Sequence, residues 1–263
     1  MKIKQNGDFN VGYNAITEHN GKFSEMLMDF GILKLAKGTT HDDNTPLEKI
    51  YLLLYGEIEV EWENEKVTVK RDSFLDDDFW AINTNKNVGI KIVGVSDDAE
   101  VAVFRTENDT LFASVARDKS NSVIETRGEG YMNDAGTRIV KTLMDKSLAP
   151  ESNIMFGEDV HYPGKWAGFP SHSHNQPEIY YYKFSPQQGF GLVKLGDEGV
   201  LVEHNDTITI DPDLVHPQVA APGYAMYFLW IIRHLDGNPY LKPTFEEQHL
   251  WVEQPGAKYW PEA

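Results

Sequence analysis

Stretches in which apolar and polar residues alternate run through most of the chain, and they predict β-strands rather than helices. The clearest is residues 56–63, in which every second side chain is a glutamate. Because successive side chains of a strand point to opposite faces, this pattern predicts an antiparallel strand with one buried face and one face in water. Residues 66–70 follow after an expected turn at Asn64-Glu65 and should return as the partner strand of a hairpin.

Several more short strands are expected, and helices are few. The continuous apolar run at residues 226–232 is rich in aromatic and β-branched side chains, so we expect a fully buried strand there. Residues 109–116 and 245–251 are the two expected short helices, and four prolines from Pro239 onward predict an irregular tail that packs across a barrel. Many short strands at regular spacing predict an all-β barrel or sandwich. The other expected strands cover residues 88–95, 100–104, 199–203 and 207–210.

Composition narrows the class of protein. The 263 residues leave room for one large or two ordinary domains. The chain contains no cysteine, which excludes disulfides and thiolate metal sites and agrees with a reducing, cytoplasmic location. We expect no signal peptide and no membrane helix, because the start of the chain lacks an apolar segment and no run approaches the roughly 18 apolar residues of a membrane span.

The charge of the chain bears on its partners. The net charge is −17, which argues against nucleic acid because binding to phosphates requires Lys and Arg. A substrate that carries a carboxylate would need a local cation to overcome this negative field.

The chemistry is expected in the second half of the chain, since seven of the nine histidines follow residue 160. His172 and His174 are two residues apart, so a strand would turn both imidazoles toward one interior. Glu178 follows after a short bend, and His216 must come from another strand. Three imidazoles and one carboxylate suit a borderline divalent cation and leave coordination positions for water or substrate. We therefore predict one divalent metal ion, with Zn, Mn, Fe and Ni not distinguished, held by His172, His174, Glu178 and His216.

A weak internal repeat indicates two barrels in tandem. His41 and the Glu-Lys-Ile-Tyr of residues 48–51 are similar to His174 and the Glu-Ile-Tyr of residues 178–180. The first half has no His-x-His pair, so we interpret His41 and Glu48 as a relic or a surface pair rather than as a second metal site.

The ligand spacing resembles that of the cupin superfamily. The first cupin motif is matched by His172, His174, Glu178 and Gly189; the second is matched by Asn205-Asp206, Pro212 and His216, with Leu214 where the motif has a glycine. The resemblance implies an all-β fold of two tandem cupin barrels, a bicupin, with double-stranded β-helix topology. We place a degenerate N-terminal barrel at residues 1–125 and a metal-binding barrel at residues 126–263.

Within the cupins, the chain is similar to the 5-deoxy-glucuronate isomerases of inositol catabolism. The similarity lies in residues 156–158, 164–166, 177–191 and 215–224. It implies an aldose–ketose isomerase that converts 5-deoxy-glucuronate to 5-dehydro-2-deoxy-gluconate. In that reaction a metal ion acts as a Lewis acid on carbonyl and hydroxyl oxygens while a base moves a proton from C2 to C1.

Candidate catalytic residues follow from strand parity and from the resemblance. Parity places Tyr180 and Tyr182 on the face of Glu178, where their hydroxyls could hold substrate or relay a proton, or could simply pack. Glu158 belongs to a matched segment and is a candidate base, with a surface acid as the alternative.

Candidate substrate-binding residues are Gln188, Lys183 and Arg233. Gln188 lies in a matched turn and could bind a sugar hydroxyl or only form the turn. Lys183 and Arg233 are candidate partners of a substrate carboxylate. Parity puts Lys183 on the outer face, where a solvated role is expected, whereas Arg233 ends a buried strand near the barrel mouth.

Other functions stay open at this point. The same site would suit an isomerase of another uronate, of the 4-deoxy-5-keto-uronate type, or a non-haem metal oxygenase of the cupin class. A binding module without turnover is the least favoured, because no basic helix-turn-helix segment is present. The expected partner is a small sugar acid, with neither nucleic acid nor membrane, and a homo-oligomer is compatible with tandem barrels.

Overall fold

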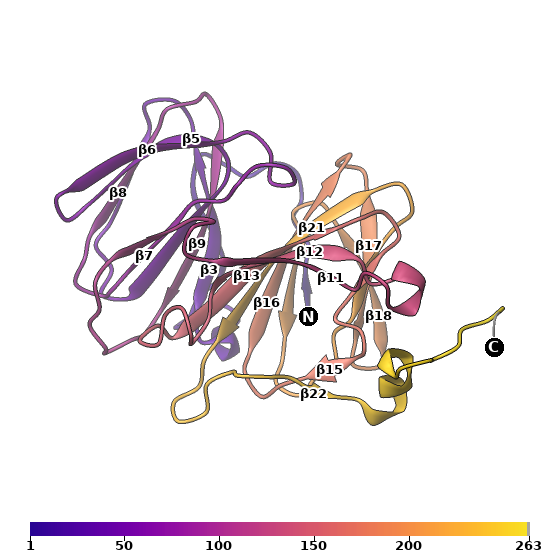
Figure 1. Cartoon of the computed structure of the whole chain (residues 1–263). Coiled ribbons are helices and arrows are strands. Elements are labelled where there is room, and N and C mark those ends of the chain that lie inside the picture. The colour runs from indigo at the N-terminus through magenta and orange to yellow at the C-terminus, as the bar shows by residue number, and fades with distance from the viewer. Residues whose placement is uncertain (262–263) are drawn as a thin grey trace. The chain divides into compact units, whose positions relative to one another are not determined.

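The computed structural model describes residues 1–261 and consists almost entirely of β-strands (Figure 1). The all-β prediction is therefore confirmed. Within these residues the helices are three short 3-10 helices, η1 (Ser24–Met26), η2 (Met132–Asp134) and η3 (Glu247–Glu253).

The chain forms two compact units, and each is assembled from more than one segment. The C-terminal unit contains residues 1–5, residues 123–142 and the chain from Met155 onward. The N-terminal unit contains residues 6–122 and 143–154. The predicted boundary after residue 125 stays a prediction. In the structure, residues 1–5 belong to the C-terminal unit and residues 143–154 belong to the N-terminal unit.

The start of the chain belongs to the C-terminal unit because it pairs there. Strand β1 (Lys2–Ile3) lies antiparallel to β19 (Thr207–Ile210), and Nζ of Lys2 lies 2.7 Å from Oδ2 of the buried Asp206. A terminal segment is ordered when backbone pairing of this kind holds it.

In the N-terminal unit, one long strand organises the sheets. The first part of β5 (Glu48–Trp62) pairs with β7 and β9, and its second part pairs with β6 and β8. The ladder shifts register near Leu53, and Gly56 follows with a φ of +96°. A side chain at Gly56 would meet the carbonyl oxygen of Asp98 at 2.5 Å, so only glycine fits this bend. The other strands of this unit are β2 (Gly12–Thr17), β3 (Asp29–Leu35), β4 (Thr40–Asp43), β6 (Glu65–Arg71), β7 (Ala81–Thr84), β8 (Ile90–Gly94), β9 (Ala99–Thr106) and β10 (Val115–Arg117).

The predicted hairpin at residues 56–70 is confirmed, with a turn one residue earlier than expected. Trp62 pairs with Glu65, so Glu63 and Asn64 form the two-residue turn, with Glu63 at a positive φ of 50°. The alternating pattern places Ile58, Val60 and Trp62 in the core of the unit.

The predicted helix at residues 109–116 is wrong. Its last residues form β10, which pairs with β7, and the preceding residues are irregular. Oδ1 of Asn108 accepts a hydrogen bond from the backbone N–H of Thr110, so the side chain holds a turn where a helix would begin. A sequence of eight residues gains too little from helical hydrogen bonds alone to compete with pairing onto a sheet.

In the C-terminal unit, a seven-stranded sheet has the order β1-β19-β16-β21-β13-β12-β11, and a four-stranded sheet has the order β14-β20-β17-β18. A two-stranded sheet joins β15 and β22. The strands are β11 (Val123–Arg127), β12 (Arg138–Met144), β13 (Ile154–His161), β14 (Trp166–Ala167), β15 (His172–Ser173), β16 (Glu178–Ser185), β17 (Phe190–Leu195), β18 (Glu198–Glu203), β20 (Gln218–Ala220), β21 (Ala225–Arg233) and β22 (Thr244–Phe245).

Strand parity decides which side chains enter the interior of this unit. Strand β16 pairs with β21 in register, Tyr180 opposite Trp230 and Tyr182 opposite Phe228, and all four side chains belong to one buried cluster. The apolar run at residues 226–232 forms the predicted buried strand, since every residue in it is buried.

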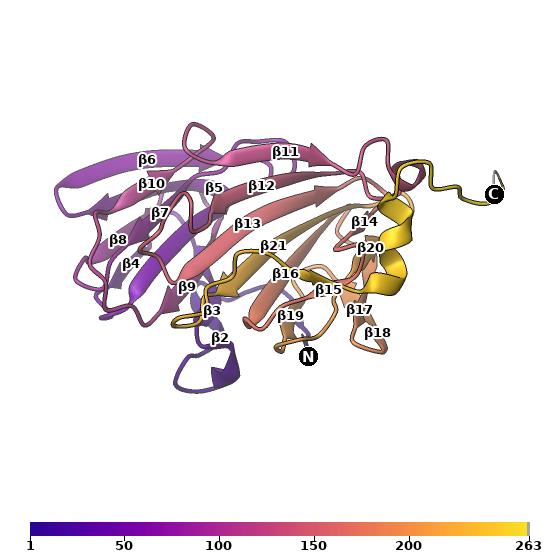
Figure 2. The ribbon, with the colours of Figure 1, turned by 60° about the horizontal axis from the view of Figure 1, so that its bottom comes forward.

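The C-terminal tail, which follows β21, is largely irregular, as predicted, and runs beside the strands of the C-terminal unit (Figure 2). Its expected helix at residues 245–251 is a 3-10 helix, η3, that begins at Glu247. The preceding β22 pairs with β15, and Phe245 stands opposite His172.

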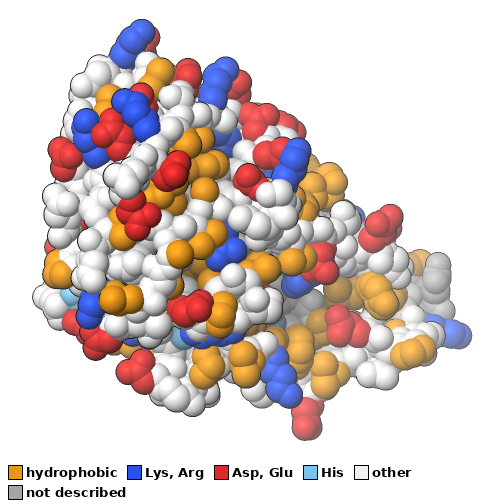
Figure 3. Space-filling view, turned by 60° about the vertical axis from the view of Figure 1, so that its left-hand side comes forward, with side chains coloured by type: hydrophobic (Ala, Val, Ile, Leu, Met, Phe, Trp, Pro, Cys, Tyr) orange, Lys and Arg blue, Asp and Glu red, His pale blue; other side chains and the backbone are white. Residues whose placement is uncertain are grey.

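Charged side chains of both signs share the visible surface. On the face in Figure 3, acidic and basic side chains lie interspersed among apolar ones. None of the helices within residues 1–261 has the length and apolar character needed to cross a membrane.

Candidate metal centre and cavity

A cavity of about 150 Å³ lies against one face of the seven-stranded sheet in the C-terminal unit. Alternate residues of β12, β13, β16 and β21 form its wall, as the two-residue period of strands requires. The apolar part of the wall includes Val140, Phe228, Trp230 and Ile232. The polar and charged part consists of Arg127, Arg138, Thr142, Asp159, His172, His174, Glu178, Tyr180, His216 and Tyr240.

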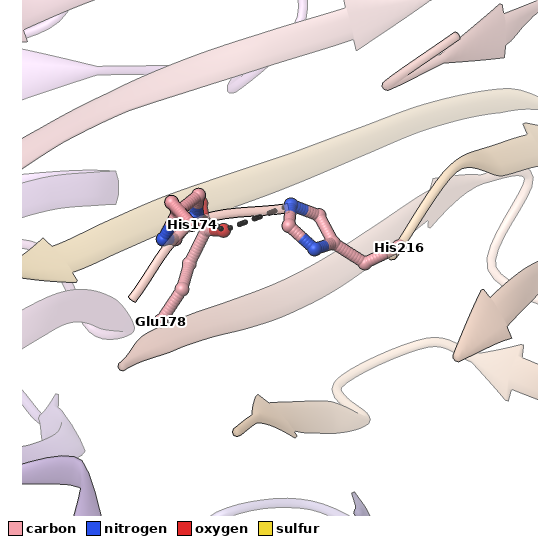
Figure 4. A group of neighbouring side chains, drawn as sticks. All are labelled: His174, Glu178 and His216. Carbon is pink, nitrogen blue, oxygen red and sulfur yellow. Dashed lines mark hydrogen bonds and ion pairs between the residues drawn. The ribbon is translucent and has the colours of Figure 1, made fainter. Parts of the chain in front are cut away.

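Three of the four predicted ligands form a tight cluster. His174, Glu178 and His216 are all buried, and one potential ligand atom from each lies within 4.8 Å of the others. Nε2 of His174 lies 3.1 Å and Nε2 of His216 lies 3.2 Å from the same oxygen, Oε2 of Glu178. Figure 4 shows the three side chains pointing toward one another, with Glu178 at the start of β16.

The tautomers of these histidines follow from their other ring nitrogens. Nδ1 of His174 lies 2.9 Å from the carbonyl oxygen of Gln176, and Nδ1 of His216 lies 2.7 Å from that of Leu214. A carbonyl oxygen only accepts, so each Nδ1 carries the hydrogen and each Nε2 of a neutral ring presents a lone pair. This is how metal-binding histidines are oriented in proteins.

The cluster needs either a proton or a metal ion among its acceptor atoms. Two lone pairs of neutral imidazoles would face one carboxylate oxygen at hydrogen-bonding distance, and three acceptors repel one another unless a proton or a metal ion lies among them. Nε2 of His216 is also fully buried without a hydrogen-bond partner among the described residues. These residues fit a divalent metal ion, because two nitrogens and a carboxylate oxygen are the donor types such ions take.

His172 lies beside the cluster rather than within it. It lines the same cavity, and its ring lies edge-on to that of His216, with centroids 5.2 Å apart. Its Nδ1 lies 3.2 Å from the carbonyl oxygen of Pro170, so its Nε2 is oriented by the same type of hydrogen bond. The role of His172 as a fourth ligand stays a prediction.

The charges of the cluster are strongly perturbed. Burial by itself would raise the pKa of Glu178, but the imidazoles of His174 and His216 outweigh burial and lower the pKa to about 2. Burial lowers the pKa of His172 to about 4, and the neighbouring His216 adds to this effect. Glu178 is thus ionised and His172 neutral at neutral pH, which are the forms that bind metal.

Turns near the second motif use residues other than glycine. Asn205 has a φ of +68° between β18 and β19, and Asp213 has a φ of +66° just before Leu214. Asn and Asp tolerate this left-handed conformation better than other residues with a side chain. The backbone N–H of Asp213 donates to the carbonyl oxygen of His174, 2.8 Å away, which ties the two ligand-bearing segments together.

The two candidate tyrosines differ in their surroundings. Tyr180 lines the cavity, and its ring centroid lies 5.6 Å from that of His216. Tyr182 is deeper and does not line the cavity, and its hydroxyl donates to Oε1 of Gln218. Strand parity therefore places both rings on the interior face, but it does not separate a cavity residue from a packed one.

Glu158 is not brought to the cavity, whereas its neighbour Asp159 is. Glu158 is fully buried elsewhere, where it accepts a 2.8 Å hydrogen bond from the hydroxyl of Tyr227 and lies 3.5 Å from Nζ of Lys141. Adjacent residues of a strand face opposite sides, so Asp159 lines the cavity and Glu158 does not, and the role of Glu158 as a base stays a prediction.

The three predicted substrate-binding residues also lie outside the cavity wall. Gln188 is exposed in the turn that ends with the hydrogen bond from the N–H of Gly189 to the carbonyl of Pro186. Lys183 is on the opposite face of β16, but it is only 4% exposed, so the expected solvated role is wrong. Its Nζ donates to Oδ1 of Asn205. Arg233 is buried and donates to the carbonyl oxygen of His234.

Five polar or charged residues of the cavity wall were not predicted from the sequence, namely Arg127, Arg138, Thr142, Asp159 and Tyr240. No local motif marks them. The one available signal was the two-residue period of β13, which identifies residue 159 as an inward position only once the strand is placed in the sheet.

In the N-terminal unit, Glu48 does not occupy the position that corresponds to Glu178 in the C-terminal unit. Tyr51 faces the interior, so the inward position two residues before it is Lys49, and Glu48 faces the other side. The buried Glu48 accepts hydrogen bonds from Asn83 and Asn108. A lysine therefore stands where the C-terminal unit has its carboxylate, and an ammonium group cannot act as a metal ligand.

Known proteins resemble this chain over most of its length. The 5-deoxy-glucuronate isomerase of Bacillus subtilis subsp. natto is 24% identical over 274 residues, which cover 96% of this chain and 97% of that protein. Among solved structures, an IolB-like protein from Salmonella typhimurium LT2 superimposes with a TM-score of 0.82 at 20% identity, covering 94% of this chain and 97% of that one.

The fold is shared with cupins. A cupin 2 conserved barrel domain protein from Leptotrichia buccalis matches 89% of this chain and 96% of its own, with a TM-score of 0.53 at 15% identity. The predicted cupin fold is thereby confirmed. The model of the KduI/IolB family matches residues 2–252, which is nearly the whole chain, and the protein therefore belongs to the KduI/IolB family.

Proposed function

We propose that this protein is a metal-dependent aldose–ketose isomerase of a sugar acid, with 5-deoxy-glucuronate as its substrate. One observation carries the proposal: two buried imidazole nitrogens converge on a single carboxylate oxygen at the wall of a cavity. The names of related proteins supply the reaction, since the relatives from Bacillus subtilis subsp. natto and Bacillus licheniformis, which match 96% of this chain, are 5-deoxy-glucuronate isomerases.

The residues that would hold the metal ion are His174, Glu178 and His216, with His172 beside them as the fourth ligand. When bound, a divalent cation would supply Lewis-acid polarisation of a carbonyl or hydroxyl oxygen. Zn, Mn, Fe and Ni all accept these donors, so the identity of the ion is left to experiment.

Tyr180 is suited to donate a hydrogen bond to the substrate. Burial raises the pKa of its hydroxyl well above 10, so the hydroxyl keeps its proton at neutral pH. The neighbouring negative charge of Glu178 acts in the same direction. A protonated phenol next to the cluster can stabilise negative charge that develops on a substrate oxygen. Tyr182 supports this arrangement by packing, because its own hydroxyl is already bonded to Gln218.

The apolar side of the cavity favours this chemistry. Phe228 and Trp230 form part of the wall and are buried. Apolar walls exclude water and lower the local dielectric constant, which strengthens each interaction between charges in the site.

The proposal is tested by measuring metal content and isomerisation on the same samples. The purified protein should contain about one divalent ion per chain, and nuclear magnetic resonance should follow conversion of 5-deoxy-glucuronate under anaerobic conditions. His174→Ala and His216→Ala should lose both the metal and at least ~100-fold of the activity, because each removes a ligand and loss of even a supporting group costs 10- to 100-fold.

His249→Ala is the matched control. This histidine lies in the same unit, but its Nε2 lies 3.6 Å from Oε2 of Glu246 and the residue does not line the cavity. The control should keep metal and activity. Full conversion by His216→Ala protein would contradict the proposal, and oxygen consumption by the iron-loaded protein without isomerisation would favour an oxygenase instead.

A further inference from the structure

A second charged assembly lines the same cavity. It consists of Arg138 on β12, Asp159 on β13 and Trp230 on β21. Nε of Arg138 donates to Oδ2 of Asp159 at 2.9 Å, and the indole Nε1–H of Trp230 donates to Oδ1 at 3.0 Å. Both oxygens of Asp159 are thus occupied by donors, and the carboxylate has a fixed orientation.

Close packing at Gly157 permits this arrangement. A side chain there would lie 2.2 Å from Cζ2 of Trp230, so the indole can rest against β13 only because residue 157 is glycine. The indole is therefore locked above the strand that carries Asp159.

Asp159 is unsuited to act as a base. Burial alone would raise its pKa, but the neighbouring His161 and the guanidinium of Arg138 outweigh burial and lower the pKa. A carboxylate that a guanidinium and an imidazole hold ionised accepts a substrate proton poorly. Its geometry instead suits the positioning of Arg138.

Arg138 keeps donors available for a ligand. A guanidinium group has five N–H donors. Its Nε bonds to Asp159, and its Nη1 donates to the carbonyl oxygen of Gly136 at 3.0 Å. Among the described residues, no hydrogen-bond acceptor is found for Nη2. The side chain is 15% exposed and lines the cavity, so the remaining N–H groups are available to a bound molecule.

The charge of the cavity supports an anionic ligand once a metal ion is bound. Two guanidinium groups, of Arg127 and Arg138, and two carboxylates, of Asp159 and Glu178, line it. These charges cancel, so a divalent ion would leave a local charge of about +2 in a chain whose net charge is −17. A molecule with a carboxylate at one end and a metal-binding oxygen at the other would satisfy both parts of the cavity.

We infer that Arg138 binds the carboxylate of the sugar-acid substrate and that Asp159 is the positioning residue that fixes it. This inference rests on the proposed function for the identity of the substrate, and it adds the residue that distinguishes a sugar acid from a neutral sugar. Arg127 plays a lesser part, because its guanidinium is half exposed and pairs with Glu125. An exposed ion pair of this kind is screened by solvent.

The test uses the metal-loaded protein and two probes that cannot isomerise. D-Gluconate carries a carboxylate, whereas D-glucitol has the same carbon chain without one. Calorimetric titration should show that the parent protein binds gluconate at least ~10-fold more tightly than glucitol. Arg138→Gln should weaken gluconate binding by about 10- to 100-fold, as expected for a lost charge-assisted hydrogen bond, and leave glucitol binding unchanged. Arg138→Lys should recover part of the loss, because it restores the charge without the planar fork.

Three controls separate a binding role from a structural one. Metal content should be the same in every variant. Arg127→Gln should change gluconate affinity less than threefold. Asp159→Asn should weaken gluconate binding in the parent protein but not further in an Arg138→Gln background, because a positioning residue acts only through the group that it positions.

Three results would contradict the proposed role of Arg138. Unchanged gluconate affinity in Arg138→Gln, a larger effect of Arg127→Gln, or no preference of the parent protein for gluconate over glucitol would overturn the inference. These binding measurements do not require turnover. If the parent protein binds gluconate through Arg138 but does not isomerise the sugar acid, the proposed function fails while the anion site stands.

Discussion

Nε2 of His216 lies 3.2 Å from Oε2 of Glu178, and both side chains are buried in the C-terminal unit (Figure 4). The ring nitrogen on the other side of His216 donates to the carbonyl of Leu214, so the pair is oriented lone pair to lone pair. Residues 38 positions apart in the chain thus present two ligand atoms to one point.

Glu178→Gln tests whether the negative charge is needed to hold the ion. The amide has nearly the same shape, but it is neutral, and we expect metal affinity to fall by at least ~100-fold. A ligand that binds only the folded state raises the melting temperature. The metal-dependent rise in melting temperature should therefore be large in the parent protein and absent in the variant, as measured by calorimetry with and without a chelator.

Tyr180→Phe and Tyr182→Phe form a matched pair. The first removes the hydroxyl that lines the cavity, so kcat should fall by about 10- to 100-fold with unchanged metal content. The second removes the hydroxyl that bonds to Gln218, so it should cost about 1 kcal/mol of unfolding free energy and affect kcat less than threefold. Steady-state kinetics and denaturant unfolding of both variants check this, and equal effects on kcat would contradict the assignment.

Gly157→Ala should displace Trp230, which forms part of the cavity wall. The added Cβ would lie 2.2 Å from the indole of Trp230 and 2.3 Å from the carbonyl oxygen of Lys141. We expect a loss of about 3 kcal/mol in unfolding free energy, as for an overpacked core, together with a changed tryptophan fluorescence spectrum. Gly199→Ala is the control, because nothing lies within 4 Å of a side chain there, and its stability should be nearly unchanged.

Asp43→Asn tests a buried ion pair in the N-terminal unit. Oδ2 of Asp43 lies 2.6 Å from Nε of Arg105, and both residues are buried. Removing Asp43 leaves the buried guanidinium with only the more distant carboxylate of Asp29, 3.9 Å away, so we expect a loss of about 3 kcal/mol at neutral pH. Asp98→Asn removes a carboxylate that is 46% exposed and paired with Lys34, and it should cost less than about 0.5 kcal/mol.

The ion pair of Asp43 and Arg105 makes the stability of the protein depend on pH. Burial raises the pKa of Asp43, but Arg105 and the hydroxyl of Tyr51 outweigh burial, and the pKa in the folded protein lies below its ordinary value of 3.8. The stabilisation is therefore fully present above pH 3.8 and disappears as the pH falls through the folded pKa. The stability difference between the parent protein and Asp43→Asn, measured by urea unfolding, should shrink in that range.

Patterns among residues close in the sequence predicted most of the strands. Ligand spacing predicted the three members of the metal cluster, His174, Glu178 and His216. The alternation at residues 56–63 is a direct record of burial on one face, and it requires no knowledge of the partner strand. Likewise, the spacing of His174 and Glu178 around a bend, with His216 on a later strand, was enough to anticipate a shared site. The expected helix at residues 109–116 failed because pairing of its last residues with β7 is not encoded in that segment.

The sequence by itself determined an all-β chain and a His/Glu/His set in its second half, because strand period and ligand chemistry are properties of neighbouring residues. Only the tertiary structure decided that Asp159 rather than Glu158 faces the cavity, and that Arg138 and Trp230 meet it there. These three residues lie on β12, β13 and β21, and strand order and register bring them together. A shift of one residue in register reverses every face, so such contacts cannot be predicted until the sheet is assembled.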